Sequence, residues 1–465
     1  MPEKQPFVHP YIPNAEPEVQ AAMLDAIGAT SIEELYAAIP AALRMQEPLD
    51  MPEPLLSEAE LKRHLAELLA QNQTCAENLS FLGAGCYQHH VPAVCDEINA
   101  RGEFLTAYAG KNYTDHGKYQ ALFEYASMMG ELLNMDVVNA PTYDGNQAAA
   151  TALRMAARIT GRDQALVIGT ISRNKLSKLH DYCRPDLAIR LLPYDRASGQ
   201  MNLDALQQEL SSRTAAVYFE NPSYLGFLET EAEQITDMAH SVGALAVVGV
   251  NPISLGVLAP PADYGADIAC GDIQPLGIHM QFGGGHGGFI ATRDEPRFVQ
   301  EYPSRLYGIA PTVAGELGFG DVAFARTSFV HRDHAKEFVG TAANLWGITA
   351  GVYLALMGPQ GMFEIGESMM ARARYAMRKL DALPGVRCPL FHAPHFNEFV
   401  VNFDGVGKTV AQIHSALRQH GIFGGKDLSQ EFPELGQSAL YAVTEIHSQS
   451  DIDRLADVLS EVIAL

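Results

Sequence analysis

Residues 215–251 have the sequence AAVYFENPSYLGFLETEAEQITDMAHSVGALAVVGVN, and this stretch decides the fold of the chain. It begins with the apolar run AAVYFEN and ends with the apolar run ALAVVGVN, and both runs have the length and the β-branched or aromatic content of buried strands. The more polar segment between them is long enough for a helix. A strand, a helix and a second strand in this order predict two parallel strands joined by a crossover helix.

Similar apolar runs lie on either side of this unit and extend the predicted sheet. They are QALVIGT (164–170), AIRLLPY (188–194) and GGFIAT (287–292). Short strands that alternate with helical stretches predict a mostly parallel sheet with helices on both faces. Before the sheet, FEYASMMGELLNM and NQAAATALRMAARIT have the spacing of amphipathic helices, and the second helix opens after the Tyr143-Asp144-Gly145 turn.

A smaller unit is expected after the Pro384-Gly385 turn. Its predicted strands are VRCPLF (386–391), EFVVNF (398–403) and SALYAVT (438–444). Its predicted helices are VAQIHSALRQHG (410–421) and DIDRLADVLSEVIAL (451–465). The sequence thus predicts an N-terminal helical segment, a large α/β domain and a small α+β domain. Their expected bounds are 1–80, 81–382 and 383–465.

The composition is that of an acidic globular protein. The 465 residues include 32 Lys and Arg against 55 Asp and Glu, a formal net charge of −23. Such a surface repels phosphate backbones and anionic lipids, so neither nucleic acid nor a membrane surface is an expected partner. No run of about 18 apolar residues occurs, and the N-terminus lacks the apolar core of a secretion signal. Six scattered cysteines without a CxxC pair fit a reducing compartment, and we expect the cytoplasm.

Two segments have features of a phosphate-binding loop. The run GGGHGG, Gly283 to Gly288, matches neither GxxxxGK[ST] nor GxGxxG, and an apolar strand follows it instead of a helix, so a tight turn between strands is the favoured interpretation. The start of the helix after the turn Tyr143-Asp144-Gly145-Asn146-Gln147 presents free N–H groups to an anion. Helix starts are common, so this one alone does not establish a phosphate site.

The histidines do not form a metal-binding pattern. His89 and His90 are adjacent, so their side chains point apart. His331 and His334 have helical spacing, but no HExxH motif or carboxylate companion accompanies them. No GxSxG motif and no Cys/His nucleophile arrangement is visible. The residues alone indicate a large α/β enzyme-like protein without a metal, and they do not indicate a particular reaction.

Several segments, in the same order along nearly the whole chain, resemble the α subunits of glycine dehydrogenase (decarboxylating), the P-protein of the glycine cleavage system. They are HPYIPN (9–14), FLGAG.Y.H.VPAV (81–94), TAY (106–108), QALFEY (120–125), MDVVNAPTYDG (135–145), NPISLGVLAPPADYGADIACGDIQPLGI (251–278), GIFGGKDLSQEFPELG (421–436) and VTEIHSQSDIDRL (443–455). This many segments in a common order make the resemblance specific.

The resemblance implies a pyridoxal-phosphate (PLP) dependent fold type I architecture, with a mostly parallel sheet in a large domain and a small C-terminal α+β domain. In this family a paired β subunit carries the lysine that binds PLP, near the subunit interface. Glycine loses its carboxylate as CO2, and the aminomethyl group passes to the lipoyl arm of the H-protein. The resemblance implies an α2β2 assembly in which this chain is inactive without its β subunit.

Two positions agree with a chain that does not bind PLP covalently. PLP needs an acid beside its ring nitrogen, usually an Asp at the end of a central strand. Here the strand AVVGV ends at Asn251, which cannot ionise. The covalent link needs a lysine after a following strand. The matching stretch GDIQPLG offers Gln274, and no lysine lies between residues 251 and 290. Both positions are therefore expected to be degenerate cofactor positions.

The family loop TAYTPYQPE-x-x-QG is altered to TAYAGKNYTDHGK in this chain. The resemblance places this loop at the pocket that the two subunits share. The expected pocket residues are Thr106, Tyr108, Lys111, Tyr113 and His116. Two further stretches differ from the family, EFVGTAANLWG with Trp346 and QFGGGHGG, in which His286 takes the place of an aromatic residue.

Because these departures cluster, three interpretations stay open. The first is a diverged α subunit of a glycine decarboxylase. The second is the α subunit of a paralogous PLP decarboxylase with a different amino acid or amine as substrate, in which Lys111 or His116 would suit an extra anionic group. The third is a catalytically inert scaffold subunit.

Overall fold

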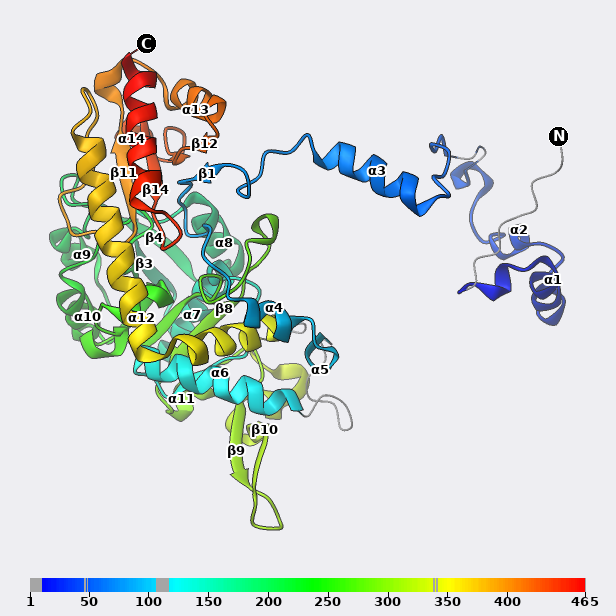
Figure 1. Cartoon of the computed structure of the whole chain (residues 1–465). Coiled ribbons are helices and arrows are strands. Elements are labelled where there is room, and N and C mark those ends of the chain that lie inside the picture. The colour runs from blue at the N-terminus through cyan, green and yellow to red at the C-terminus, as the bar shows by residue number, and fades with distance from the viewer. Residues whose placement is uncertain are drawn as a thin grey trace. The chain divides into compact units, whose positions relative to one another are not determined.

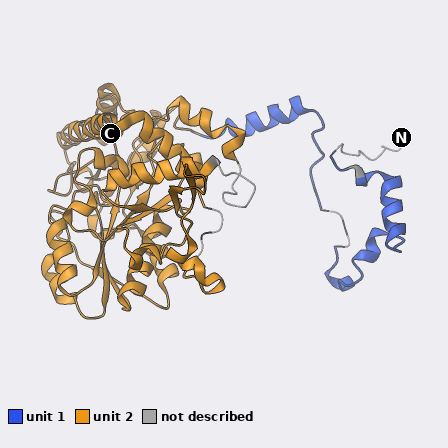
Figure 2. Cartoon of the chain, turned by 90° about the horizontal axis from the view of Figure 1, so that it is seen from below, with its two compact units in different colours: residues 1–72 blue, residues 73–465 orange. Residues whose placement is uncertain are grey.

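The computed structural model describes most of the chain. The described residues are 11–45, 47, 49–105, 117–337, 339 and 342–464. The chain divides into two compact units, residues 1–72 and residues 73–465 (Figure 2). The bounds predicted for the three domains remain a prediction.

The first unit is helical, as predicted, and has no core of its own. Its helices are α1 (Pro17–Ala26), α2 (Ile32–Leu35) and α3 (Glu58–Leu69). None of the described residues in these helices is buried. The apolar side chains of this unit therefore remain on its surface.

The second unit is built on a seven-stranded sheet in the order β2-β8-β7-β6-β5-β3-β4. Its strands β3, β4 and β8 are labelled in Figure 1. The strands are β2 (Val137–Val138), β3 (Gln164–Ile168), β4 (Ala188–Leu192), β5 (Thr214–Glu220), β6 (Leu245–Val250), β7 (Ile268–Asp272) and β8 (Gly288–Thr292). All neighbours pair in parallel except those of β8, which is antiparallel to β7 and to β2. All five predicted strand runs of the sheet are confirmed.

Every residue of β5, β6 and β8 is buried, because helices cover both faces of the sheet. Alternate residues of the strands belong to two different cores, as the two-residue period of a strand requires. One core contains residues of α6 (Gly117–Leu133), α10 (Ala232–Ser241) and α12 (Asn344–Asp381). The other contains residues of α7 (Gly145–Thr160) and α8 (Arg173–Cys183). The predicted mostly parallel sheet with helices on both faces is confirmed.

The C-terminal part contains a three-stranded antiparallel sheet in the order β11-β14-β13. Its strands are β11 (Glu398–Asn402), β13 (Lys426–Asp427) and β14 (Ser438–Ala442), and its helices are α13 (Val410–Gln419) and α14 (Gln449–Ala464). A short parallel pair, β1 (Leu79–Ser80) with β12 (Ile422–Phe423), joins the residues after the first unit to this part of the chain. The predicted α+β character is confirmed.

The predicted strand over 386–391 is wrong. Only Arg387 forms an isolated bridge there, with Asn402. Pro389 lacks an N–H to donate to a sheet, so the apolar residues around it pack without forming a strand. A hairpin of β9 (Tyr307–Pro311) and β10 (Leu317–Asp321) was not predicted. Among the described helices, none combines the length and the hydropathy that crossing a membrane requires.

Candidate active site

A cavity of about 430 Å³ lies where the parallel strands β5, β6 and β7 end. Binding sites of α/β sheets usually lie at this carboxyl edge. The strand ends contribute Glu220, Asn251 and Asp272 to its wall. The C-terminal part of the chain contributes further side chains, among them Glu398 and Lys426. The cavity is therefore lined by both the large sheet and the C-terminal part of the chain.

The N-terminus of α7 borders the cavity and is occupied by carboxylates of the chain itself. The helix begins at Gly145, directly after the predicted turn, and Asp144 caps it by accepting a hydrogen bond from the backbone N–H of Gln147 at 2.7 Å. Asp272 accepts the N–H of Gly145 at 2.8 Å and the N–H of Gln274 at 2.9 Å. A helix N-terminus favours negative charge, and here the two carboxylates accept the N–H groups of Gly145 and Gln147.

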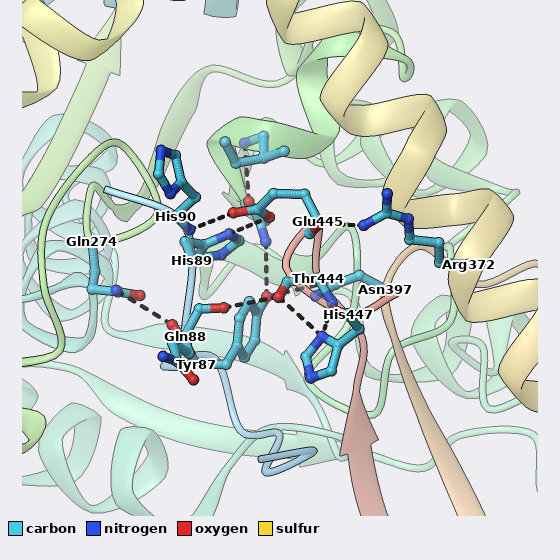
Figure 3. Close-up of polar contacts among 12 residues, drawn as sticks. Tyr87, Gln88, His89, His90, Gln274, Arg372, Asn397, Thr444, Glu445 and His447 are labelled. Atoms are coloured by element: carbon cyan, nitrogen blue, oxygen red, sulfur yellow. Dashed lines mark hydrogen bonds and ion pairs between the residues drawn. The ribbon is translucent and has the colours of Figure 1, made fainter. Parts of the chain in front are cut away.

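The two degenerate cofactor positions both bind Tyr87. Asn251 directly follows β6, and its Nδ2 donates to the Tyr87 hydroxyl at 2.9 Å. Gln274 lies just after β7, and its Nε2 donates to the carbonyl oxygen of Ile278 at 3.0 Å and to that of Tyr87 at 3.4 Å. Figure 3 shows the Gln274 side chain directed at the Tyr87 backbone. The side-chain amides of Asn251 and Gln274 are thus both hydrogen-bonded to other residues of this chain.

The cavity does not fit PLP as a covalently bound cofactor. Gln274 offers no amine, Asn251 offers no acid for the ring nitrogen, and the N-terminus of α7 already holds two carboxylates. Sequence reasoning overlooked two cavity lysines, Lys175 and Lys426, because they lie outside the 251–290 interval. Each of them is bound to a glutamate and to a tyrosine hydroxyl.

Lys175 is held in its charged form. Burial opposes the charge of its ammonium, but the carboxylate of Glu220 outweighs burial and raises the pKa of Lys175 above its usual value. Lys426 donates to Glu431 at 2.7 Å and to the hydroxyl of Tyr224 at 2.6 Å. A protonated amine is not a nucleophile, and the raised pKa of Lys175 makes this amine a poorer one than an ordinary lysine.

The segment Tyr87–His90 is fixed between the large sheet and the C-terminal domain (Figure 3). His89 Nδ1 lies 2.8 Å from Glu445 Oε2, and the N–H of His90 donates to Glu445 Oε1 at 2.6 Å. The hydroxyl of Thr444 donates to the Gln88 carbonyl at 2.8 Å. Burial would raise the pKa of Glu445, but the bond with His89 holds it below its usual value. Glu445 thus contacts the ring of His89 and the backbone of His90.

A charged cluster that sequence reasoning missed lies on the same cavity wall. His286 Nδ1 lies 3.1 Å from Asp272 Oδ2. This contact with Asp272 is the main cause that raises the pKa of His286 to about 10. His286 reaches the cavity from the glycine run, which forms the predicted turn before β8. A side chain on Gly285 would meet the carbonyl oxygen of His279 at 2.0 Å, so this turn needs glycine.

Glu398 at the start of β11 was also missed. Its Oε1 accepts the backbone N–H groups of Ala84 at 2.5 Å and of Gly85 at 3.3 Å. Burial raises the pKa of Glu398 to about 7. No spacing in the sequence links residues more than 300 positions apart, so this contact could not be foreseen.

The other residues that the sequence analysis singled out lie outside the cavity or outside the described residues. The five expected pocket residues of the altered loop lie outside the described residues. Trp346 lies in α12 and packs against the core. His331 and His334 belong to a short 3-10 helix, Ser328–His334. Within the described part of the chain, no group of three or more His, Cys, Asp or Glu side chains could hold a metal ion.

Comparisons with known proteins agree with this geometry. The family model of the glycine cleavage system P-protein matches residues 9–459. The chain is 39% identical to the probable glycine dehydrogenase (decarboxylating) subunit 1 of Carboxydothermus hydrogenoformans, over 97% of this chain and 99% of that protein. It is 36% identical to the protein of the same name from Staphylothermus marinus, over 98% of each chain.

Solved structures resemble the fold. A crystal structure of glycine decarboxylase (P-protein) of the glycine cleavage system, in inhibitor-bound form, has a TM-score of 0.85 and 35% identity, and it covers 99% of this chain and 100% of that chain. A sphingosine-1-phosphate lyase of Burkholderia pseudomallei has a TM-score of 0.65 at 15% identity, covers 92% of this chain and 94% of that chain, and shows a shared fold only. The fold is therefore the predicted PLP-dependent fold type I, and the chain belongs to the glycine cleavage system P-protein family.

Proposed function

We propose that this chain is the α subunit of a two-subunit glycine decarboxylase, in which a β subunit supplies the lysine that binds PLP. The observation that carries this proposal is the hydrogen bond of Gln274 to Tyr87, at the position where a lysine is required. The relatives are named subunit 1, and this name implies a second subunit. The chain would thus contribute part of an active site, and it would be inactive alone.

The residues of this chain would shape a pocket at the interface with the β subunit. PLP on the β subunit would supply the electron sink for the loss of CO2 from glycine. A cationic Lys111 or a protonated His116 would bind a carboxylate by a charge-assisted hydrogen bond. The proposed pocket residues of this chain are Thr106, Tyr108, Lys111, Tyr113 and His116. The lipoyl arm of the H-protein would then take the aminomethyl group from an α2β2 assembly.

Reconstitution tests this proposal. The chain is purified alone and together with the β subunit, and the exchange of labelled bicarbonate into the carboxyl group of glycine is measured. We expect no exchange from the chain alone and full exchange from the pair. Exchange at the full rate from the isolated chain would contradict the proposal.

Pocket variants separate the remaining interpretations. Tyr108→Ala and His116→Ala should each slow exchange by the pair at least about tenfold, because positioning groups of a pocket contribute this much. His392→Ala, a change at an exposed histidine of the C-terminal domain, is the control and should leave the rate unchanged. Unchanged rates in both pocket variants would indicate an inert scaffold. A pair that binds PLP but does not exchange glycine would indicate a different amino acid or amine as the substrate.

We also propose a reducing compartment, the cytoplasm. The support is that all six cysteines are free thiols in the structure.

A further inference from the structure

Two buried polar groups on the cavity wall have no hydrogen-bond partner in the described part of the chain. They are Oγ of Ser223 and Nδ2 of Asn397, and both residues line the cavity. Ser223 is 4% exposed and Asn397 is 2% exposed. Buried polar groups of native proteins nearly always have a partner, so each of these two groups indicates a missing one. A side-chain amide nitrogen only donates, so the missing partner of Asn397 is an acceptor such as an oxygen.

The main chain holds these two groups on neighbouring segments. The N–H of Ser223 donates to the carbonyl oxygen of Phe227 at 2.9 Å, and the N–H of Gly226 donates to that of Ser223 at 2.9 Å, which closes a tight turn. A side chain on Gly226 would meet the carbonyl oxygen of Glu398 at 2.0 Å. The turn therefore packs directly on the segment that contains Asn397.

A lysine adds a third donor on this wall. Nζ of Lys426, which also lines the cavity, bonds to the hydroxyl of Tyr224 at 2.6 Å and to Glu431 at 2.7 Å. An ammonium group carries three N–H donors, and these two bonds engage two of them. Tyr224 directly follows Ser223 in the chain. A hydroxyl, an amide and an ammonium together suit the two oxygens of a carboxylate.

A carboxylate on the same wall offers a partner for a cation. Glu398 directly follows Asn397 and lines the cavity. It accepts the backbone N–H groups of Ala84 and Gly85 through Oε1, whereas its Oε2 makes no hydrogen bond among the described residues. Burial raises the pKa of Glu398 to about 7, and a cation beside a buried carboxylate stabilises its charged form. The wall thus presents donors for a carboxylate beside an acceptor for an ammonium group.

We propose that this cavity binds a small α-amino acid as a zwitterion, without a covalent bond. The carboxylate of the ligand accepts hydrogen bonds from Ser223, Asn397 and Lys426, and its ammonium group donates to Glu398. A cavity of about 430 Å³ admits a molecule of this size. The site is separate from the pocket proposed at the interface with the β subunit. The inference therefore goes beyond the proposed function and does not depend on it.

Calorimetric titration of the full chain tests the ligand class. Glycine, alanine and serine are the probes at pH 8, where Glu398 is ionised. We expect at least one of them to bind at one saturable site with a Kd of about 1 mM or tighter, an affinity that ligands of this size can reach. Acetate and methylamine should bind at least about tenfold more weakly, because each lacks one of the two charged groups. If none of the three amino acids bound saturably, or if acetate bound as tightly as they do, the proposal would be overturned.

A pair of hydroxyl variants tests the position of the ligand. Ser223→Ala removes a hydroxyl that bonds nothing in the described part of the chain, so the fold is retained, and it should weaken amino-acid binding about tenfold. Thr151→Val is the control. It removes another buried hydroxyl without a partner, which lies in α7 and does not line the cavity, and it should leave the Kd unchanged. An unchanged Kd in Ser223→Ala, or equal losses of affinity in both variants, would refute the proposed site. If Ser223→Ala does not fold, the comparison with acetate in the unaltered chain still decides.

Discussion

The hydroxyl of Tyr87 joins the end of β6 to the residues just before β11, and Tyr87→Phe removes this hydroxyl while keeping the ring. In the native chain, Asn251 donates to the hydroxyl at 2.9 Å and the hydroxyl donates to Asn397 Oδ1 at 3.4 Å. Tyr87 is only 5% exposed, but Asn251 is half-buried and lines the cavity, so its freed N–H group is not cut off from solvent. The net loss of a hydrogen bond costs about 0.5–1.5 kcal/mol, and we expect the free energy of unfolding to fall by this amount.

Tyr125→Phe is the matched control for this prediction. Tyr125 is fully buried, and its hydroxyl has no hydrogen-bond partner within the described part of the chain. Removal of this hydroxyl should leave the free energy of unfolding unchanged or slightly increased, since no bond is lost. Urea denaturation followed by circular dichroism measures both variants. If the two variants had equal unfolding midpoints, the hydroxyl of Tyr87 would not join these segments in the way described.

Two other predictions concern stability. Burial raises the pKa of Glu398 from 4.5 to about 7, so the folded chain binds this proton more tightly than the unfolded chain and loses stability as the pH rises from 4.5 to 7. Glu398→Gln should remove this loss and stabilise the chain by about 3 kcal/mol at pH 8 but little at pH 5. Urea denaturation measures this gain in stability, and an equal gain at both pH values would contradict the raised pKa of Glu398. Gly226 has φ 92°, and an added Cβ would lie 2.0 Å from the backbone oxygen of Glu398, so Gly226→Ala should cost about 3 kcal/mol or more. Gly407→Ala should cost only about 1 kcal/mol, because Gly407 has φ 76° and no atom lies within 4 Å of an added Cβ. If thermal unfolding showed similar losses of stability for Gly226→Ala and Gly407→Ala, the close contact at Gly226 would be contradicted.

The sequence predicted the sheet well because its strands are continuous apolar runs. The strand β7 was not among the predicted runs, since its residues IACGD include a glycine and an aspartate that are poor strand formers. Arg387 to Phe391 were predicted as part of a strand because of their apolar content, but Pro389 interrupts the hydrogen bonding. Local sequence patterns thus identify most helices and strands. They fail where one proline prevents strand pairing or where a strand contains residues that are poor strand formers.

The candidate site was only half predictable. Asn251 could be found because it directly follows a predicted strand, and Gln274 could be found because the stretch GDIQPLG matches the family at the position where a lysine is needed. Tyr87, Cys86 and Glu398 could not be found, because tertiary packing brings distant segments together and no local spacing records it. The glycine run was recognised as a turn, yet the contact of its His286 with Asp272 is shown only by the structure.

The central claim is that this chain forms no covalent bond with PLP through its own lysines. The most direct measurement is to saturate the assembled pair with PLP, reduce it with borohydride and locate the phosphopyridoxyl group by mass spectrometry. The account predicts this group on one lysine of the β subunit and none on this chain. A phosphopyridoxyl group on Lys175, on Lys426 or on any other lysine of this chain would contradict it.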